Sequence, residues 1–331
     1  MTAHTDRAHL SCDQARSLSL GALRGLGFSD LEAGIITDHV LDAALCGYEY
    51  SGLPKILNVA QMMSQIAPDG PMRLLKETSV SALYDGANHN GMITMDRATD
   101  MAILKAQQHG FAIVGLNRTW MSGRSAYFVE RIARAGLVGI HTIGSTALVA
   151  PPGAAAAAVG TNPIAFGFPT ADEPLVIDMS FAALMFTDLR LRARLGEGLP
   201  AGCAIDAHGQ PTQDPVMALA GAVLCFGGYK GFGMALAMQA MGGLAGADDD
   251  PDGAGYLVIA IKPDLLVPLD RYRLGVSAML SRIKGTARQP GVDEIRIPSE
   301  RSMRTRALLT KEGIEIDKHV YEKLQQLALA A

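Results

Sequence analysis

Two tyrosines, Tyr48 and Tyr50, stand shortly before a lysine, Lys55, in the segment GYEYSGLPK. A phenol can donate a hydrogen bond to a reacting oxygen, and its pKa of about 10 falls when a neighbouring cation such as Lys55 stabilises the phenolate. The segment is therefore a candidate source of a proton donor. The alternative is that both tyrosines only pack, and the sequence leaves the two possibilities open.

Motifs that mark several other chemistries are missing from the chain. It has no G-x-G-x-x-G dinucleotide fingerprint, no G-x-S-x-G around a nucleophilic serine, and no phosphate-binding Walker A loop. The 4 cysteines show no C-x-x-C spacing, and the histidines show no spacing typical of zinc ligands. We therefore expect no standard Rossmann site and no metal centre, and we expect the thiols to be buried and reduced.

Length and charge narrow the class of protein. The chain of 331 residues is long enough for about two domains, and 49% of its residues are hydrophobic. The net charge of -4 leaves no basic surplus to neutralise a phosphate backbone, so nucleic acid is not an expected partner. No apolar run is long enough to span a membrane, and the first residues lack the apolar core of a signal peptide. These features indicate a cytoplasmic protein.

Hydrophobic periodicity predicts helices that alternate with apolar strands, which is the pattern of an α/β protein. Ser29 and Glu32 form a capping box at the start of one helix, and Gly110 is a suitable C-cap for another. The expected helices are 13–27, 29–44, 94–108, 125–135, 231–243, 270–284, 299–311 and 317–329. The expected strands are 78–85, 111–116, 137–144, PIAFGFP, PLVIDM, YLVIAIK and a short EIRIP. The 231–243 helix is apolar nearly all round, so we expect it to be buried.

Several segments together resemble the malate/L-lactate dehydrogenase family. This family also holds ureidoglycolate and sulfolactate dehydrogenases and the Δ1-piperideine-2-carboxylate/Δ1-pyrroline-2-carboxylate reductases. The most specific segments are VGTNPIAFGFP at 159–169 and GGYKGFGMALAMQAMGGLAGA at 227–247, in this order. The others are CGYEYSGLPKI at 46–56, VIDMS at 176–180, IRIPSERS at 295–302, and the regions 114–140 and 196–215. The resemblance covers most of the chain.

The resemblance implies a non-Rossmann nicotinamide-binding fold in which helices flank a mixed sheet. It implies a homodimer that uses NADPH or NADH to reduce the C=O or C=N bond of a small carboxylate-bearing substrate. It also implies three regions. They are an N-terminal helical region for substrate and dimer contacts (1–85), a central α/β cofactor-binding domain (86–290), and a C-terminal strand and helices that pack back on the N-terminal region (291–331).

The catalytic segment departs from the family's pattern, which reads roughly G-H-D-S-H-G-L-x-R. Ser51 stands where the family has its proton-donating histidine, and Tyr50 stands where it has a serine. Lys55 replaces the arginine that holds the substrate carboxylate, so the charge is kept without the planar pair of hydrogen bonds. A ketone needs a proton on the developing alkoxide, and serine alone does not supply one at neutral pH. His141 is either a substitute donor or simply a buried histidine.

The resemblance assigns roles to three groups of residues. Catalysis is assigned to Tyr48, Tyr50, Ser51 and Asp188, and substrate binding to Lys55, Thr161, Phe186 and Thr187. Cofactor binding is assigned to Met121, Ser122, Gly123, Arg124, Ser125, Asp178, Met179, Ser180, Tyr229, Lys230, Arg296 and Arg301. The lysine and the arginines can pair with phosphates, and the glycine permits close approach of the backbone.

Three functions remain open. The first is an NAD(P)H-dependent reductase of a small cyclic imine that bears a carboxylate. An iminium substrate already carries its proton, and Asp188 falls where the imine-reductase branch has an acid. The second is a 2-hydroxy-acid dehydrogenase that uses a tyrosine as its acid, and the third is a non-redox enzyme or binding protein. Both redox functions require that Met121 and Phe186 leave room for a nicotinamide ring.

Overall fold

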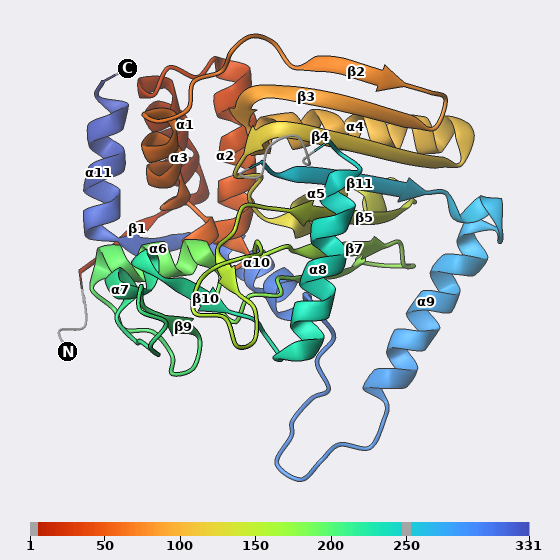
Figure 1. Cartoon of the computed structure of the whole chain (residues 1–331). Helices are drawn as coiled ribbons and strands as arrows, with labels where there is room; N and C mark the ends of the chain where they lie inside the picture. The colour runs from red at the N-terminus through yellow and green to blue at the C-terminus, as the bar shows by residue number, and fades with distance from the viewer. Residues whose placement is uncertain (1–5, 247–252, 331) are drawn as a thin grey trace.

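A seven-stranded mixed sheet forms the centre of the computed structural model, which describes residues 6–246 and 253–330 (Figure 1). The strand order is β2-β3-β4-β11-β5-β7-β8, and only the pair β3 and β4 is parallel among these neighbours. The strands are β2 (Arg73–Glu77), β3 (Ser81–Asn90), β4 (Phe111–Trp120), β5 (Val138–Gly144), β7 (Ile164–Phe168), β8 (Leu175–Met179) and β11 (Gly255–Ile261). The expected mixed sheet is confirmed.

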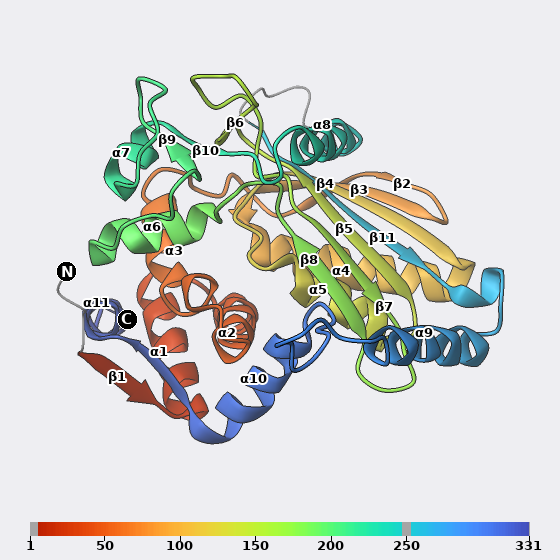
Figure 2. The ribbon, with the colours of Figure 1, turned by 90° about the horizontal axis from the view of Figure 1, so that it is seen from below.

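Helices flank this sheet on both faces (Figure 2). One face carries α4 (Gly91–His109) and α5 (Ser125–Arg134), and the other carries α8 (Tyr229–Gly243). The small side chains Ala98, Ala102 and Ala106 recur at helical spacing on α4 and are fully buried against the strands. The left-handed Gly110 ends α4, as the sequence predicts.

Both ends of the described chain lie in one separate layer (Figure 1). Strand β1 (Arg7–Leu10) pairs antiparallel with β12 (Ile314–Asp317). Around this pair lie α1 (Cys12–Gly25), α2 (Asp30–Leu45), α3 (Lys55–Met63), α10 (Glu300–Glu312) and α11 (Lys318–Ala328). They bury an apolar core, and the predicted capping box of Ser29 and Glu32 starts α2. The expected boundary at residue 85 falls inside β3, so we propose that the central domain begins with β2.

A small third unit consists of β6 (Val149–Ala150), β9 (Ala204–Ile205) and β10 (Ala222–Leu224), with α6 (Phe186–Leu195) and α7 (Pro215–Ala220) beside them. Two short 3-10 helices, η1 (Glu49–Ser51) and η3 (Pro263–Leu265), precede α3 and α9 (Leu269–Lys284). Helix α9 projects from the body, and none of its residues is buried (Figure 1). Among the described residues, no helix combines the length and the apolar character needed to cross a membrane.

Two expectations about individual elements are wrong. The EIRIP segment forms no strand, because no neighbouring strand offers it backbone partners within the described chain. Helix α8 is not enclosed: it buries small residues such as Ala235 against the sheet and leaves Met234 and Leu236 44% and 46% exposed. The apolar residues on the outer side of α8 are therefore left open to solvent in this chain.

Charged side chains connect the separate layer to α5. Arg306 on α10 donates hydrogen bonds to Asp42 Oδ1 on α2 at 2.9 Å and to Glu130 Oε1 on α5 at 2.6 Å. Arg124, the residue before α5, pairs with the other carboxylate oxygen of Asp42. Although burial opposes it, the hydrogen bond from Arg306 holds the pKa of Glu130 below its usual value. These pairs fix the start of α5 against α2 and α10.

We expect Arg306→Gln to lower the free energy of unfolding by about 2 kcal/mol, because two shielded carboxylates each lose a charged partner. Denaturant unfolding followed by circular dichroism measures this change. Arg304→Gln on the same helix is the matched control, since Arg304 and its partner Glu294 are 58% and 41% exposed and such pairs contribute about 0–1 kcal/mol. Equal losses of unfolding free energy in the two variants would show that the shielded Arg306 pairs stabilise the fold no more than an exposed pair does.

Candidate active site

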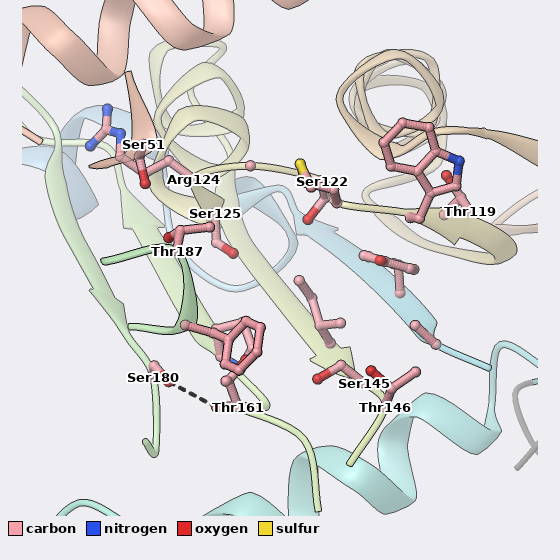
Figure 3. A pocket seen from close by; sticks show the side chains of 18 of the residues that line it. Ser51, Thr119, Ser122, Arg124, Ser125, Ser145, Thr146, Thr161, Ser180 and Thr187 are labelled. Atoms are coloured by element: carbon pink, nitrogen blue, oxygen red, sulfur yellow. Dashed lines mark hydrogen bonds between the residues drawn. The ribbon is translucent and has the colours of Figure 1, made fainter. Parts of the chain in front are cut away.

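A large cavity lies where the central sheet meets the separate layer and α6. Its volume is about 1220 Å³, which exceeds the 300–1000 Å³ typical of small-molecule pockets. It therefore has room for a substrate together with a cofactor. Figure 3 shows the hydroxyl groups of Ser51, Ser122, Ser125 and Thr187 around it.

Most of the residues that the sequence assigned to a site line this cavity. They come from four parts of the chain that are distant in sequence: the segment before α3, the loop between β4 and α5, the loop before β7, and the segment from β8 into α6. The lining includes Tyr48, Tyr50, Ser51, Lys55, Met121, Ser122, Gly123, Arg124, Ser125, Thr161, Asp178, Met179, Ser180, Phe186 and Thr187. Met121 and Phe186 form part of the wall and leave the cavity open, as the redox functions require.

Five assigned residues do not line the cavity: Asp188, Tyr229, Lys230, Arg296 and Arg301. Phe186 and Thr187 face the cavity from the first turn of α6, whereas the Asp188 carboxylate accepts a hydrogen bond from Arg192 Nε, one turn further along, at 3.2 Å. The other four are exposed, and Tyr229 is 81% exposed. Arg301 still contacts the site indirectly, because its guanidinium lies 5.6 Å from the centre of the Tyr48 ring.

Positive charge without a carboxylate partner is concentrated at one end of the cavity. Lys55 is 4% exposed, and Arg190 on α6 lies over the Phe186 ring at 4.9 Å. Among the described residues, neither cation forms an ion pair or a protein hydrogen bond. Burial, with the charge of Arg190, lowers the pKa of Lys55 to about 8. The unpaired positive charge at this end of the cavity is complementary to an anion.

Sequence reasoning missed Arg190. The signal was available, since Arg190 follows Phe186 and Thr187 by one helical turn and so shares their face. Finding Arg190 required the prediction of α6, and the short amphipathic segment of this helix was not recognised. The unassigned polar lining on β3, on β4, after β5 and at the start of β11 includes Asp85, Asn88, Asn117, Arg118, Thr119, Trp120, Ser145, Thr146 and Tyr256. The polar run NRTW at the end of β4 would have pointed to it.

Tyr50 is a candidate proton donor whose pKa Lys55 does not lower. Burial, together with the carboxylates Asp178 and Asp188, raises the pKa of Tyr50 to about 12. Tyr50 therefore stays protonated and is a weak acid. Tyr48 presents its ring to Arg124 at 5.6 Å. His141 is fully buried in β5 outside the lining, and burial lowers its pKa to about 4, so it is not the substitute donor.

The loop between β4 and α5 is held rigidly beneath the cavity. The Arg124 backbone N–H donates to His39 Nε2 at 2.7 Å, and the Ala126 N–H donates to the Asp178 carboxylate at 2.8 Å. Burial and the charges of Lys55 and Arg124 keep the pKa of His39 well below its usual value, so it is a neutral acceptor. Arg124 Nε is buried without a hydrogen-bond partner in the described residues. This free donor fits an anionic cofactor.

The GTNP turn has a structural residue beside a cavity residue. Asn162 is fully buried at a φ of 41°, accepts a hydrogen bond from the Ser145 N–H at 2.9 Å and donates one to the Ala235 carbonyl at 2.8 Å. It therefore ties the end of β5 to α8. Thr161 lines the cavity, and its carbonyl accepts a hydrogen bond from the Ser180 hydroxyl at 2.9 Å (Figure 3).

The described residues contain no group of three or more His, Cys, Asp or Glu side chains arranged to hold a metal ion. All four cysteines are free, with Cys46 and Cys203 buried and Cys12 and Cys225 half-buried. The expected reduced state of the thiols is thus compatible with the fold, although two of them are less buried than the sequence suggested.

We expect Gly123→Ala to destabilise the protein by about 3 kcal/mol, because overpacking adds to an unfavourable backbone conformation. Gly123 has a φ of 84°, and an added Cβ would lie 2.1 Å from His39 Nε2. Gly27→Ala is the control, since Gly27 has a φ of 89° with open space around it and should lose only about 1 kcal/mol. Thermal and denaturant unfolding compare them; equal losses would contradict the proposed contact.

Known proteins resemble this chain over nearly its whole length. Residues 10–325 match the malate/L-lactate dehydrogenase family. The malate/(S)-sulfolactate dehydrogenase of Methanothermus fervidus is 31% identical over 96% of this chain and 97% of its own. The Δ1-pyrroline-2-carboxylate reductase 1 of Burkholderia ambifaria is 30% identical over 96% of this chain and 97% of its own.

Solved structures share the fold. A dehydrogenase from Sinorhizobium meliloti superimposes with a TM-score of 0.89 at 28% identity, covering 98% of this chain and 99% of that one. The Δ1-piperideine-2-carboxylate reductase of Pseudomonas syringae pvar. tomato has a TM-score of 0.83 at 27% identity, covering 97% and 99%. The sequence match over residues 10–325 and these shared folds identify the chain as a member of the malate/L-lactate dehydrogenase family.

Proposed function

We propose that the protein is a nicotinamide-dependent oxidoreductase that interconverts a small 2-oxo acid and the corresponding 2-hydroxy acid. The observation that carries this proposal is the pair of cations, Lys55 and Arg190, that face the cavity without a carboxylate partner among the described residues. Buried charge is costly unless it is paired, so a carboxylate-bearing ligand is the natural complement.

The same charge distribution favours a carbonyl over an iminium at the reacting carbon. A cyclic iminium brings a positive charge, which Lys55 and Arg190 repel, whereas a ketone is neutral before reduction. Asp188, the residue that favoured an imine from the sequence, is turned away and paired with Arg192. The geometry thus supports a 2-oxo acid more strongly than the imine that the sequence favoured.

Reduction of a carboxylate-bearing cyclic imine remains the second candidate function. The observation in its favour is Asp178, whose carboxylate lines the cavity and can offset the charge of an iminium. Two similar proteins, from Burkholderia ambifaria and Pseudomonas syringae, carry the name of a reductase of this class. The third possibility, loss of redox chemistry, receives no support from the cavity, which is open.

The residues of the cavity fit a dinucleotide, which as NADPH or NADH supplies the hydride when bound. The loop from Met121 to Ser125 offers two serine hydroxyls and the unpartnered Arg124 Nε. The far end, near Asn117 and Arg118, provides further polar groups for the ribose and phosphate parts. We propose that Tyr229, Lys230, Arg296 and Arg301 act in another role, because they lie outside the lining.

A homodimer is the proposed assembly. Large apolar side chains are exposed together on α8, where Tyr229, Met234 and Leu236 are 81%, 44% and 46% exposed. Leu274 and Ile283 on the projecting helix α9 are 62% and 40% exposed (Figure 1). Exposed apolar surface of this kind favours an interface, and two-fold pairs are the commonest assemblies.

We expect the purified protein to consume NADH or NADPH with a 2-oxo acid about tenfold more efficiently than with Δ1-piperideine-2-carboxylate, a difference of 1.4 kcal/mol in charge interaction. The loss of the nicotinamide absorbance band, measured with each dinucleotide and each substrate, gives kcat/KM. Asp38→Asn, outside the cavity lining, is the control and should keep wild-type rates. A preference for the imine would establish the second candidate, and no turnover with no dinucleotide binding by calorimetry would overturn both.

We expect light scattering coupled to gel filtration to give a mass of about twice 34.9 kDa, the mass of one chain. Leu236→Asp should shift the protein toward the monomer, because a charge on α8 opposes burial of that face. Leu31→Asp, on an exposed position of α2, is the control. A monomer in the wild type would contradict the proposed assembly.

A further inference from the structure

The proton that a 2-oxo acid needs must come from a group that faces the cavity, and the described lining contains no histidine. Tyr50 and Tyr256 are poor donors, because burial raises the pKa of both phenols. Although burial opposes it, the Ala87 N–H and the arginines Arg73 and Arg118 hold the pKa of Asp85 below its usual value. Burial raises the pKa of Asp178, and the hydrogen bond from the Ala126 N–H and the charge of Arg124 oppose this rise. The lining thus leaves few groups that can release a proton near neutral pH.

Lys55 and Arg190 are the lining cations that have no carboxylate partner among the described residues, and of the two only a lysine can release a proton near neutral pH. Its side chain is buried at the first turn of α3, faces the cavity, and has no acid within the described residues to hold its proton. The groups that interact with its charge are His39 on α2 and Arg190 on α6, and Tyr50 lines the same cavity. His39 is neutral and Tyr50 stays protonated, so Arg190 is the charge that acts on Lys55, and it opposes protonation.

Arg190 has the position and the free hydrogen-bond donors that binding of a substrate carboxylate requires. It lies on the cavity face of α6, stacked on Phe186, and its planar guanidinium has no protein acceptor in the described chain. Helix α6 is fixed to α3 one turn away, where Arg194 donates a hydrogen bond to Asn58 Oδ1. Helices α3 and α6 therefore hold Lys55 and Arg190 at a fixed separation at this end of the cavity.

We propose that Lys55 is the proton donor of the reaction and that Arg190, rather than Lys55, binds the substrate carboxylate; this inference rests on the proposed reduction of a 2-oxo acid. As the carbonyl carbon gains a C–H bond to the hydride from the reduced dinucleotide, the π electron pair moves to the oxygen. That oxygen takes a proton from Lys55 Nζ, whose N–H electrons remain on the neutral amine. The amine regains a proton from solvent, and the oxidised dinucleotide leaves.

The proposal fixes a pH dependence in each direction. Reduction needs protonated Lys55, so kcat for reduction should fall at alkaline pH, with a midpoint at or above about 8, the pKa of the lysine without ligand, because a bound carboxylate raises that pKa. Oxidation of the hydroxy acid needs the neutral amine, so its kcat should rise over the same range. A lysine that only anchors a carboxylate would instead show this pH dependence in substrate binding.

The pKa of Lys55 can be measured without turnover. We expect competitive acetylation with acetic anhydride, followed by mass spectrometry, to give a midpoint near 8 for Lys55, with exposed Lys323 as the internal reference. Arg190→Met should raise the midpoint of Lys55, because it removes the neighbouring positive charge. A midpoint for Lys55 equal to that of Lys323 would overturn the proposal even if the enzyme proves inactive on every substrate.

Lys55→Arg separates donation from anchoring, since arginine keeps the charge but does not release a proton. We expect kcat to fall by about 10²- to 10⁴-fold with little change in KM. Arg190→Met should raise KM by about tenfold to hundredfold, the loss of a hydrogen-bonded charge pair. Arg192→Gln on the same helix, outside the lining, should change neither constant.

Three results would overturn the assignment. The first is wild-type kcat in Lys55→Arg, and the second is a rise in its KM alone, which would make Lys55 the anchor. The third is a loss of most of kcat in Tyr48→Phe or Tyr50→Phe while Lys55→Arg stays active. If Lys55→Arg fails to fold by circular dichroism, Lys55→Met and the acetylation midpoint of the wild type decide. If the wild type reduces no 2-oxo acid, the proposed function is refuted. The acetylation midpoint of Lys55 then still tests the proposed titration of this lysine separately.

Discussion

The burial of Lys55 beside Arg190 is the constraint on which the site depends. Two positive charges are held at one end of a cavity with no carboxylate to neutralise them among the described residues, and Arg194 and Asn58 keep the two helices from moving apart. The fold bears the cost of this arrangement, which a bound anion offsets. Such preorganised charge stabilises a ligand without reorganisation at the moment of binding.

The other walls of the cavity are fixed by contacts between layers. The loop before α5 is held from below by His39 and from the side by Asp42, which Arg306 of the C-terminal helix α10 also contacts. A glycine at position 123 is required because the imidazole of His39 occupies the space where a Cβ would project. The separate layer thus shapes the side of the cavity at the loop from Met121 to Ser125 as well as the side at Lys55.

The residues of the segment from Tyr48 to Lys55 and their neighbour Arg190 form a consistent set. Ser51 leaves the segment without an imidazole, Lys55 is a cation that can lose its proton, and Arg190 offers a second cation nearby. An arginine at position 55 would keep its proton permanently, so lysine changes what the position can do as well as how it binds. We propose that this set keeps two cations for a carboxylate-bearing substrate and makes Lys55 the titrating group.

The sequence determined the α/β class, most of the long elements, the caps at Ser29 and Gly110, and the list of residues that line the cavity at Tyr48–Lys55 and Met121–Ser125. These features depend on local periodicity, turn chemistry and motifs, which are properties of short segments. Tertiary structure alone decided that Asp188 faces Arg192, that Tyr50 has a raised pKa, that α8 is exposed, and that Lys55 has Arg190 as its charged neighbour. Burial and through-space charge set these properties, and both depend on which distant segments pack together.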